Sequence, residues 1–399
     1  MKKVLIFLIT LILATSFLFS QRTLQIWAMG EEAKKLNIMA EKFVEQHPGI
    51  KVEIQEIPWS AAYDKLLTAI AGGTLPDVAQ MGTTWMGAFG VLGVFDDLRP
   101  YLAKSDLSKE DFFEGSWNTV VVNEKVLGIP WYVDVRVMFY RTDVLKEVGY
   151  DKAPQTWEEL YDVTKKLAAR GEGKYGLSLL YTGVFGNEFM PFVWQAGGRI
   201  FDEKGNVRVT DPEFVEAIEY YAKFFWEGLA PMGGSDLFQD FANGNVPIFF
   251  SGPWMVKMLD EVTPQIKGKW AVALMPKKVT RTSFVGGCNW VIFSSSKNKD
   301  LAWQFIEFMS KPENQLEWYR IIGDLPAVKE TWNHSELSDD PVMKVFYEQL
   351  KDAKSPPNVP YWEEIATAIS KRVEEVIYKK RTPEDAAKLL KKDIEKIVK

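Results

Sequence analysis

The sequence of 399 residues contains few of the side chains that metal and redox sites require. It has one cysteine, Cys288, and two histidines, His47 and His334. A single cysteine excludes a disulfide within the chain, and so few thiols and imidazoles give little support to a zinc site. The patterns HExxH, GxSxG and GxxxxGK[ST] are also absent. Zinc-protease, serine-hydrolase and nucleotide-binding chemistry are therefore poorly supported, and we expect no cofactor and no metal.

The charged residues show no excess of one sign along the chain. The 48 Lys and Arg residues are interspersed with 54 Asp and Glu residues, which gives a net charge of -6. Without a basic stripe, a nucleic-acid partner is not expected, and without a polybasic patch neither is a membrane surface.

Long apolar runs are missing except at the N-terminus, where residues 4–19 follow Lys2 and Lys3. This pattern is typical of a secretory signal peptide, so we expect residues 1–20 to be cleaved off. The alternative is an uncleaved membrane anchor, because the run approaches the length that spans a bilayer. No cysteine ends the run, which argues against a lipid-anchored terminus. The mature protein is expected to be periplasmic or secreted.

Aromatic residues are abundant, with 15 Trp, 14 Tyr and 25 Phe. Indole rings are hard to bury with the N–H satisfied, so we expect a few of them to line a ligand surface. The length of the chain suggests two domains, and no low-complexity linker separates them.

Strand and helix patterns alternate along the first hundred residues. The spacing of apolar residues predicts strands at 23–28, 51–57 and 77–81, and helices at 31–46, 61–71 and 84–92. This alternation indicates an α/β unit with parallel strands.

The alternation restarts further along the chain, so we predict two lobes of similar construction. A capping box at Thr156 and Glu159 begins a helix at 156–170, and Thr382 caps the last of two terminal helices. The other expected elements are strands at 174–180, 246–250 and 286–293 and helices at 212–228 and 299–309.

The stretch GIPWYVDVRVMFYR, residues 128–141, is predicted to be one strand with two different faces. Val133, Val135, Val137 and Phe139 form the core face, and Tyr132, Asp134 and Arg136 form the other. An aromatic ring, an acid and a base on so apolar a segment need polar partners.

Several segments together resemble the extracellular solute-binding proteins of carbohydrate ABC importers, the maltose-binding-protein-like family. They occur in the family's order and cover nearly the whole mature chain. The segments are GGTLPDVAQMGTTW (72–85), GVLGVFDDL (90–98), residues 128–160, FANGNVPIFFSGPW (241–254), GGCNWVIF with the following helix (286–309) and GDLPAVKETW (323–332).

The resemblance implies a periplasmic-binding-protein-like fold of two α/β lobes, joined by a hinge with three chain crossings near 131–134, 274–276 and 324–326. The implied N-terminal lobe comprises 21–132 and 276–325, and the C-terminal lobe comprises 133–275 and 326–399. The ligand cleft would lie between them. The implied function is that of a monomeric receptor, not an enzyme, which binds a disaccharide or short oligosaccharide and delivers it to ABC transporter membrane permease subunits.

Sugar hydroxyls bind well to carboxylates and guanidinium groups, and sugar C–H faces pack on flat aromatic rings. Asp134, Arg136 and Trp254 supply these groups, although Asp134 and Arg136 could instead simply pair with each other. The full set of expected ligand-binding residues, most of them carried over from the resemblance, is Glu31, Glu32, Trp59, Gly82, Thr83, Thr84, Trp85, Trp131, Tyr132, Asp134, Arg136, Asn187, Glu188, Trp254, Gly287, Cys288, Asn289 and Trp362.

Three other functions fit parts of the sequence. A secreted carbohydrate-active hydrolase needs two carboxylates across a glycosidic bond, and 54 acidic residues make such a pair inevitable by chance. The same fold could instead bind a monosaccharide or a polyamine. A polyamine site also uses acids and aromatic rings, but a cationic ligand gives no reason for Arg136.

Overall fold

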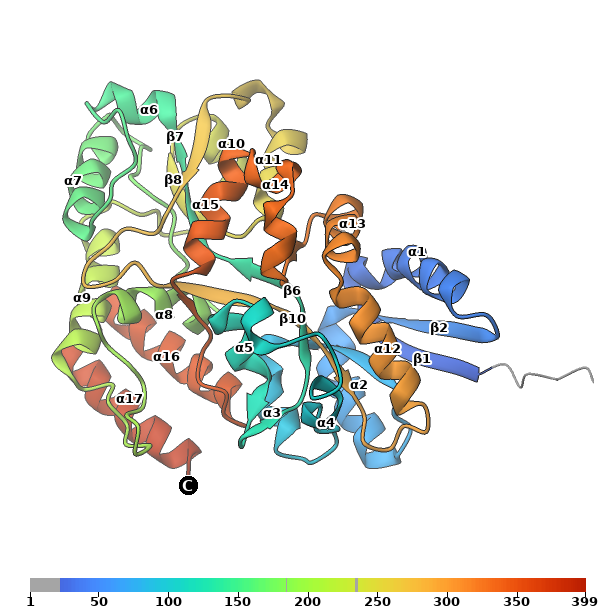
Figure 1. The fold of residues 1–399 in the computed structure, drawn as a ribbon. Coiled ribbons are helices and arrows are strands. Elements are labelled where there is room, and N and C mark those ends of the chain that lie inside the picture. The colour runs from blue at the N-terminus through green and yellow to red at the C-terminus, as the bar shows by residue number, and fades with distance from the viewer. Residues whose placement is uncertain (1–21, 184, 234–235) are drawn as a thin grey trace, which may run out of the picture.

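A computed structural model describes residues 22–183, 185–233 and 236–399. The predicted signal peptide lies outside the described residues. Within them, no helix has both the length and the apolar character needed to cross a bilayer. The elements gather into two α/β lobes, and strands β6 and β10 lie on the side of the first lobe that faces the second (Figure 1).

The first lobe is built on a mixed sheet with the strand order β11-β6-β10-β3-β1-β2. Strand β1 is parallel to β2 and β3, as the alternation predicts, whereas β10 is antiparallel to β3 and β6. A short strand, β12, pairs with β10. The strands are β1 (Arg22–Met29), β2 (Ile50–Ile57), β3 (Val78–Gly82), β6 (Ile129–Val135), β10 (Ser283–Ile292), β11 (Leu325–Pro326) and β12 (Ala353–Lys354).

Helices cover this sheet with apolar stripes. Helix α1 buries Leu36, Met39, Ala40 and Phe43, the stripe expected from their spacing. The helices of this region are α1 (Gly30–Gln46), α2 (Trp59–Gly72), α3 (Met86–Gly90), α4 (Arg99–Leu102), α5 (Glu114–Val120), α12 (Lys299–Ser310), α13 (Pro312–Ile322), α14 (Ser335–Ser338) and α15 (Pro341–Leu350), and a small hairpin is formed by β4 (Val121–Val122) and β5 (Lys125–Val126).

The second lobe contains an antiparallel sheet in the order β8-β7-β9. Its strands are β7 (Val137–Arg141), β8 (Ile248–Ser251) and β9 (Trp270–Ala273). The prediction of one strand over 128–141 is therefore wrong. The chain leaves the first sheet after β6 and enters the second at β7, and Arg136 lies between them. Its backbone N–H donates to Phe284 O, and Ser283 Oγ donates to Arg136 O.

The strand predicted at 174–180 is also wrong, since this segment is irregular. A Cβ on Gly176 would lie 2.3 Å from Cβ of Thr164, so the backbone packs directly on a helix instead of extending a sheet. Only isolated backbone bonds connect it to the sheet, such as Ser178 N–H to Ile248 O at 2.8 Å.

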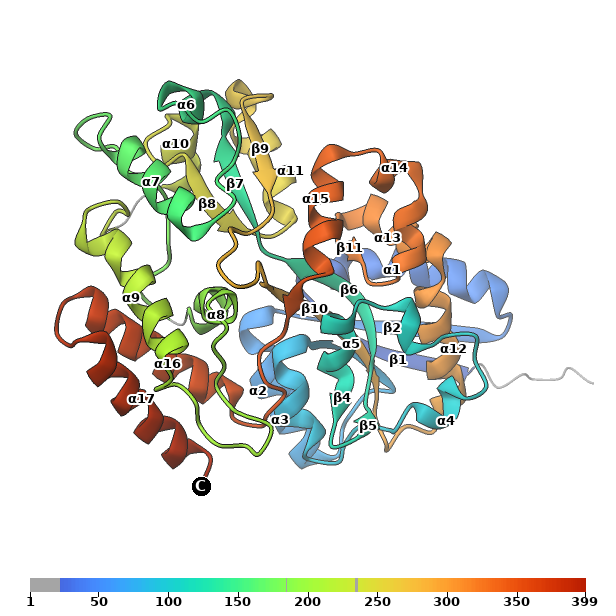
Figure 2. The ribbon, with the colours of Figure 1, turned by 60° about the vertical axis from the view of Figure 1, so that its left-hand side comes forward.

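The helices of the second lobe pack mainly on one another, with α16 in contact with α8, α9 and α17 (Figure 2). The predicted caps are confirmed: Thr156 accepts from Glu159 N–H and Thr382 from Asp385 N–H. The helices are α6 (Thr142–Glu147), α7 (Trp157–Ala168), α8 (Gly186–Gln195), α9 (Pro212–Trp226), α10 (Leu237–Ala242), α11 (Trp254–Val262), α16 (Trp362–Ile377) and α17 (Pro383–Ile397).

The assignment of chain segments to lobes stays a prediction. Met343 and Phe346 of α15 belong to an apolar cluster that contains the large sheet and extends to Met255 and Leu259 of α11. Ile365 and Ile369 of α16 belong with the cluster of the second lobe.

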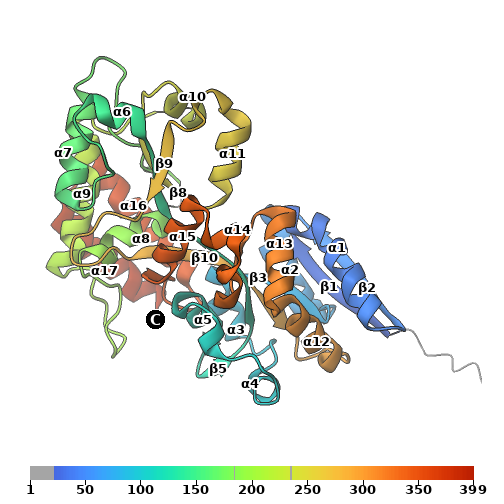
Figure 3. The same cartoon turned by 45° about the horizontal axis from the view of Figure 1, so that its top comes forward.

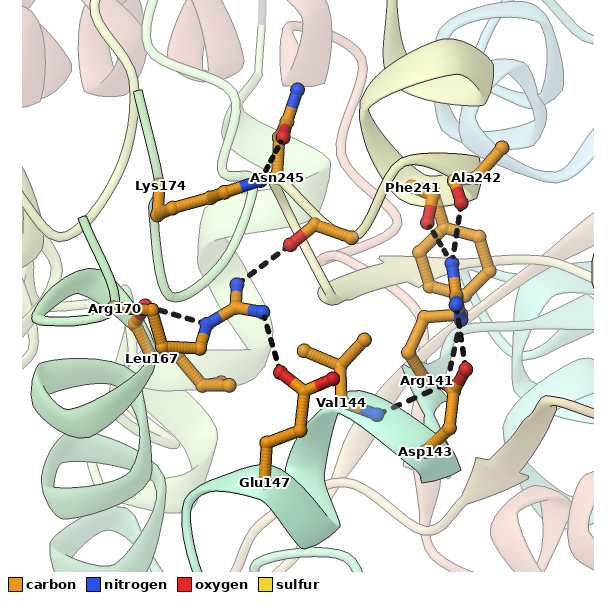
Figure 4. A network of polar contacts seen from close by, with 11 residues as sticks. Arg141, Asp143, Val144, Glu147, Leu167, Arg170, Lys174, Phe241, Ala242 and Asn245 are labelled. Atoms are coloured by element: carbon orange, nitrogen blue, oxygen red, sulfur yellow. Dashed lines mark hydrogen bonds and ion pairs between the residues drawn. The ribbon is translucent and has the colours of Figure 1, made fainter. Parts of the chain in front are cut away.

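A buried arginine fixes the turn that precedes β8. Arg141, which is 6% exposed, donates from Nε and Nη2 to Asp143 and from Nη1 to the carbonyl oxygens of Phe241 and Ala242, both at 2.7 Å (Figure 4). These carbonyls end α10, where helix oxygens need partners from outside the helix. Arg141 therefore holds the segment that leads through β8 to Trp254.

Replacing Arg141 by Met removes these donors and leaves the carbonyls and the Asp143 carboxylate without them. We expect the free energy of unfolding to fall by about 2–3 kcal/mol in urea titrations. Arg208→Met is the control, because Arg208 pairs with Asp211 at the surface with 43% of its side chain exposed. The control should lose less than about 1 kcal/mol, and equal losses would contradict the role given to Arg141.

Candidate ligand-binding cleft

A cavity of about 610 Å³ lies between the two lobes. The start of α1 and the end of α13 form one wall, and α11 forms the other, facing them in Figure 3. Strand β6 contributes Tyr132 and Asp134 to its lining. The volume falls within the range of about 300–1,000 Å³ that is typical of small-molecule sites.

Trp254 presents an aromatic ring to this cavity. It begins α11 directly after Gly252 and Pro253, and a Cβ on Gly252 would lie 2.1 Å from the ring atom Cζ3. Glycine at 252 therefore lets the ring lie against the backbone. The side chain is still 44% exposed, so ring surface remains open to the cavity.

Arg136 fills the space behind this ring. Its guanidinium carbon lies 4.7 Å from the centroid of the Trp254 ring and 5.1 Å from that of Phe284. Nη1 donates to Asp134 Oδ1, and Nη2 lies 4.0 Å from Glu188 Oε1. The pairing of Asp134 with Arg136, expected as an alternative to ligand binding, is thus present. Asp134 also lines the cavity, so the pair forms part of its wall.

Glu32 is oriented by a buried hydrogen-bond network. The Tyr132 hydroxyl donates to Glu32 Oε1 at 2.7 Å, and Gln80 Nε2 donates to the same hydroxyl at 3.2 Å. Burial raises the pKa of both Tyr132 and the Cys288 thiol well above their usual values. Tyr132 therefore stays a neutral donor, which holds one carboxylate oxygen of Glu32 and leaves the other for a ligand.

Asp324 is a cavity residue that the sequence analysis missed, although it lies in the GDLP segment used for the resemblance. Burial, reinforced by the nearby charge of Glu32, raises its pKa to about 8, while a hydrogen bond from Trp318 Nε1 at 3.1 Å opposes this. Its carboxyl group is therefore largely neutral at pH 7. It can donate a hydrogen bond to a ligand as well as accept one. Lys35, Lys257, Met258 and Glu261 also line the cavity and were not predicted.

Trp59 belongs to an aromatic group at the edge of the first lobe. It lines the cavity, is 38% exposed, and its ring centroid lies 5.5 Å from that of Trp85. Gly30 makes this placement possible: its φ is 63°, and a Cβ there would lie 2.6 Å from Trp59 Nε1. Next to Trp85, Thr84 lies near Glu363 at the start of α16 in the second lobe, where burial raises the pKa of the Glu363 carboxyl group and the Thr84 side chain opposes this rise.

Two of the predicted tryptophans are packing residues. Trp131 is 1% exposed and stacks on Trp290 with 4.0 Å between ring centroids. Trp362 is also 1% exposed, and its Nε1 donates to Asn187 Oδ1 at 3.1 Å. The structure therefore gives Asn187 the role of a partner for Trp362. Because neither ring lines the cavity, we leave both tryptophans out of the proposed site.

The remaining predicted residues support the cavity from behind. Asn289 is fully buried and bonds Thr119, and a Cβ on Gly287 would lie 2.2 Å from Tyr132 O. Cys288 is buried beside Tyr132, and Gly82 and Thr83 are buried at the end of β3. Strand β10 therefore positions Tyr132 without reaching the cavity itself.

Of the predicted set, the structure gathers seven residues around the cavity: Glu31, Glu32, Trp59, Tyr132, Asp134, Trp254 and, through its contact with Asp134, Arg136. Five Asp or Glu side chains and two lysines line it. In the part of the chain that the structure describes, no group of three or more His, Cys, Asp or Glu side chains is arranged to hold a metal ion.

Two α/β lobes with a polar, aromatic-lined cavity between them define a periplasmic-binding-protein-like fold, as expected. Residues 29–316 match the family of bacterial extracellular solute-binding proteins, and the chain belongs to this family. Proteins of this family bind solutes and are not enzymes, so the hydrolase alternative is not favoured.

Individual relatives are similar over nearly the whole chain. The sugar-binding protein MalE from Xanthomonas citri is 33% identical, with a TM-score of 0.89 over 94% of this chain and 97% of that chain. A solute-binding protein from Thermotoga lettingae, solved with alpha-D-tagatose, is 28% identical, with a TM-score of 0.80 over 95% of this chain and 100% of that chain. The galactooligosaccharide-binding protein of Bacillus subtilis is 25% identical over 91% of this chain and 86% of its own length.

The raised pKa of Asp324 predicts a pH dependence of stability. The folded protein keeps this proton up to about pH 8, whereas the unfolded chain releases it near the ordinary value of 3.8. Raising the pH between these values therefore favours unfolding, by up to about 1.4 kcal/mol per pH unit. Asp324→Asn should remove this contribution. The free energy of unfolding of the variant should therefore increase relative to that of the parent protein as the pH rises.

Urea unfolding at pH 5, 6, 7 and 8 measures this difference. Asp260→Asn, which removes an exposed carboxylate from α11, controls for the loss of one negative charge. Parallel pH profiles for the parent protein and Asp324→Asn would show that the pKa of Asp324 is not raised, and would contradict the prediction.

Proposed function

We propose that this protein is the sugar-binding receptor of an ABC import system. In this role it binds a disaccharide or short oligosaccharide in the cavity between its lobes and delivers the sugar to membrane permease subunits. No bond of the sugar is broken. The names of the Xanthomonas citri and Bacillus subtilis relatives, a sugar-binding and a galactooligosaccharide-binding protein, support a carbohydrate ligand.

The combination of groups around the 610 Å³ cavity carries this proposal. The exposed ring of Trp254 provides a flat surface for the C–H face of a pyranose, and Met258 with Ile321 extends the apolar surface. Around it, Glu32, Asp134 and Asp324 offer strong hydrogen-bond partners for hydroxyl groups. Because Asp324 can donate and the other two accept, neighbouring hydroxyls can each find a suitable partner.

A polyamine fits the same cavity less well. Its amino groups would meet the like charges of Lys35 and Lys257 on opposite walls. A neutral ligand rich in hydroxyls has no such conflict. A monosaccharide would fill only part of the cavity. The volume of the cavity therefore favours a ligand of two or more sugar units.

The mechanism is hinge closure. Glu32 and Asp324 belong to the first lobe and Trp254 to the second, so a sugar that contacts all three stabilises the conformation in which the lobes approach. The chain passes from one sheet to the other at Arg136, which makes the β6–β7 junction one of the hinge segments. The permease then binds the closed form.

Further parts of the proposal concern the state of the protein in the cell. The receptor acts as a monomer without nucleic acid, in the periplasm or secreted, after cleavage of the signal peptide at residues 1–20. The absence of a cysteine at the end of the apolar run supports cleavage over lipid anchoring.

Thermal-shift screening of mono-, di- and oligosaccharides and polyamines tests the ligand class. A sugar that binds only the folded protein raises the melting temperature. Trp254→Ala should weaken binding of that sugar by about tenfold to a hundredfold in calorimetry, because it removes the stacking surface. Tyr378→Ala is the matched control: Tyr378 is 42% exposed, close to the 44% of Trp254, but does not line the cavity. A polyamine response with none to any sugar would overturn the proposal.

A further inference from the structure

A second cavity of about 260 Å³ opens beside the first, within the second lobe. Trp254 lines both cavities. We call the second one the side chamber. Arg136 and Glu188 also line it, and Nη2 of Arg136 lies 4.0 Å from Glu188 Oε1. A ligand stacked on Trp254 in the larger cavity therefore lies next to the side chamber.

The walls of the side chamber are mainly apolar and closely packed. Leu179, Phe192, Tyr221, Phe249 and Met275 line it, and each is at most 9% exposed. Phe192 packs edge-on against Tyr221, with ring centroids 5.1 Å apart and an interplanar angle of 83°. The shape of the chamber is thus fixed by the core of the second lobe.

Polar partners for a sugar are scarce in this space. Besides Arg136 and Glu188, the main polar side-chain groups among the lining residues are the hydroxyls of Ser178, Ser251 and Tyr221, and the Tyr221 hydroxyl already donates to Leu180 O. A pyranose carries hydroxyls around its whole edge, and each one buried without a partner costs free energy. The lining of the side chamber therefore suits an apolar group better than another sugar unit, in contrast to the larger cavity with its five acidic side chains.

We propose that the side chamber receives an aromatic substituent attached to the sugar, so that the ligand is an aryl glycoside. This inference rests on the proposed sugar-binding function. A cavity of about 150 Å³ lined by apolar side chains can hold benzene, so 260 Å³ accommodates a phenyl ring with part of its linkage. The edge-on rings of Phe192 and Tyr221 offer both edges and faces for aromatic packing.

Calorimetry with matched glycosides tests this inference. The probes are methyl and phenyl maltoside and methyl and phenyl lactoside, which share the sugar and differ only in the substituent. For the disaccharide that binds, the phenyl glycoside should bind at least about tenfold more tightly than the methyl glycoside, because binding transfers its phenyl ring from water into the apolar chamber.

Leu237→Trp, a substitution of a half-buried lining residue on α10, fills the chamber. In this variant the affinity for the methyl glycoside should be retained, and the advantage of the phenyl glycoside should fall below about threefold. Leu180→Trp, at a lining residue that is 52% exposed, serves if the first variant does not fold. Equal affinities for the methyl and phenyl glycosides in the parent protein would overturn the inference. A phenyl advantage that survives in a folded filling variant would do the same.

Failure of the proposed function gives a different result. If the thermal-shift screen identifies another saccharide, its methyl and phenyl glycosides replace the maltosides and lactosides. If no saccharide of that screen binds, the sugar-receptor proposal is at fault, and indole alone then tests the chamber by ligand-observed NMR. Indole binding that is lost in Leu237→Trp would support an aromatic site. Absence of indole binding to the parent protein would overturn it.

Discussion

The guanidinium group of Arg136 holds together the part of the molecule on which the site depends. It lies where the chain leaves the large sheet for the small one, pairs with Asp134 and stacks between Trp254 and Phe284. One cation thus fixes a carboxylate of the first sheet and the aromatic platform of the second lobe. Without it, Asp134 would be a half-buried charge with no partner, and the ring of Trp254 would lose the group that supports it.

The distribution of charge around this centre gives the cavity its chemistry. Glu32, Asp134 and Asp324 converge on one space, and three ionised carboxylates would repel one another. The structure reduces this repulsion in three ways: Tyr132 donates to Glu32, Arg136 pairs with Asp134, and Asp324 stays protonated up to about pH 8. The result is a wall that both donates and accepts hydrogen bonds, as neutral hydroxyl-bearing ligands require.

Residue patterns predicted most of the elements because apolar periodicity reports burial directly, as in the stripe of α1. They failed where tertiary contacts decide. The alternation in 128–141 is continuous across two strands, and only the pairing of β6 and β7 with different sheets reveals the break at Arg136. In the same way, composition cannot distinguish Trp131, stacked in the core, from Trp254, which the preceding Gly252 and Pro253 place at a strand end. Asp324 was missed because its role comes from the proximity of Glu32, which is distant in sequence.

The central claim is that a sugar joins the two lobes by contacting both walls of the cavity. Small-angle X-ray scattering, with and without a saturating concentration of the saccharide that raises the melting temperature most, measures this directly. The account predicts that the radius of gyration decreases when the saccharide is added, because the lobes close around it. A radius of gyration that stays unchanged at saturation would contradict the account.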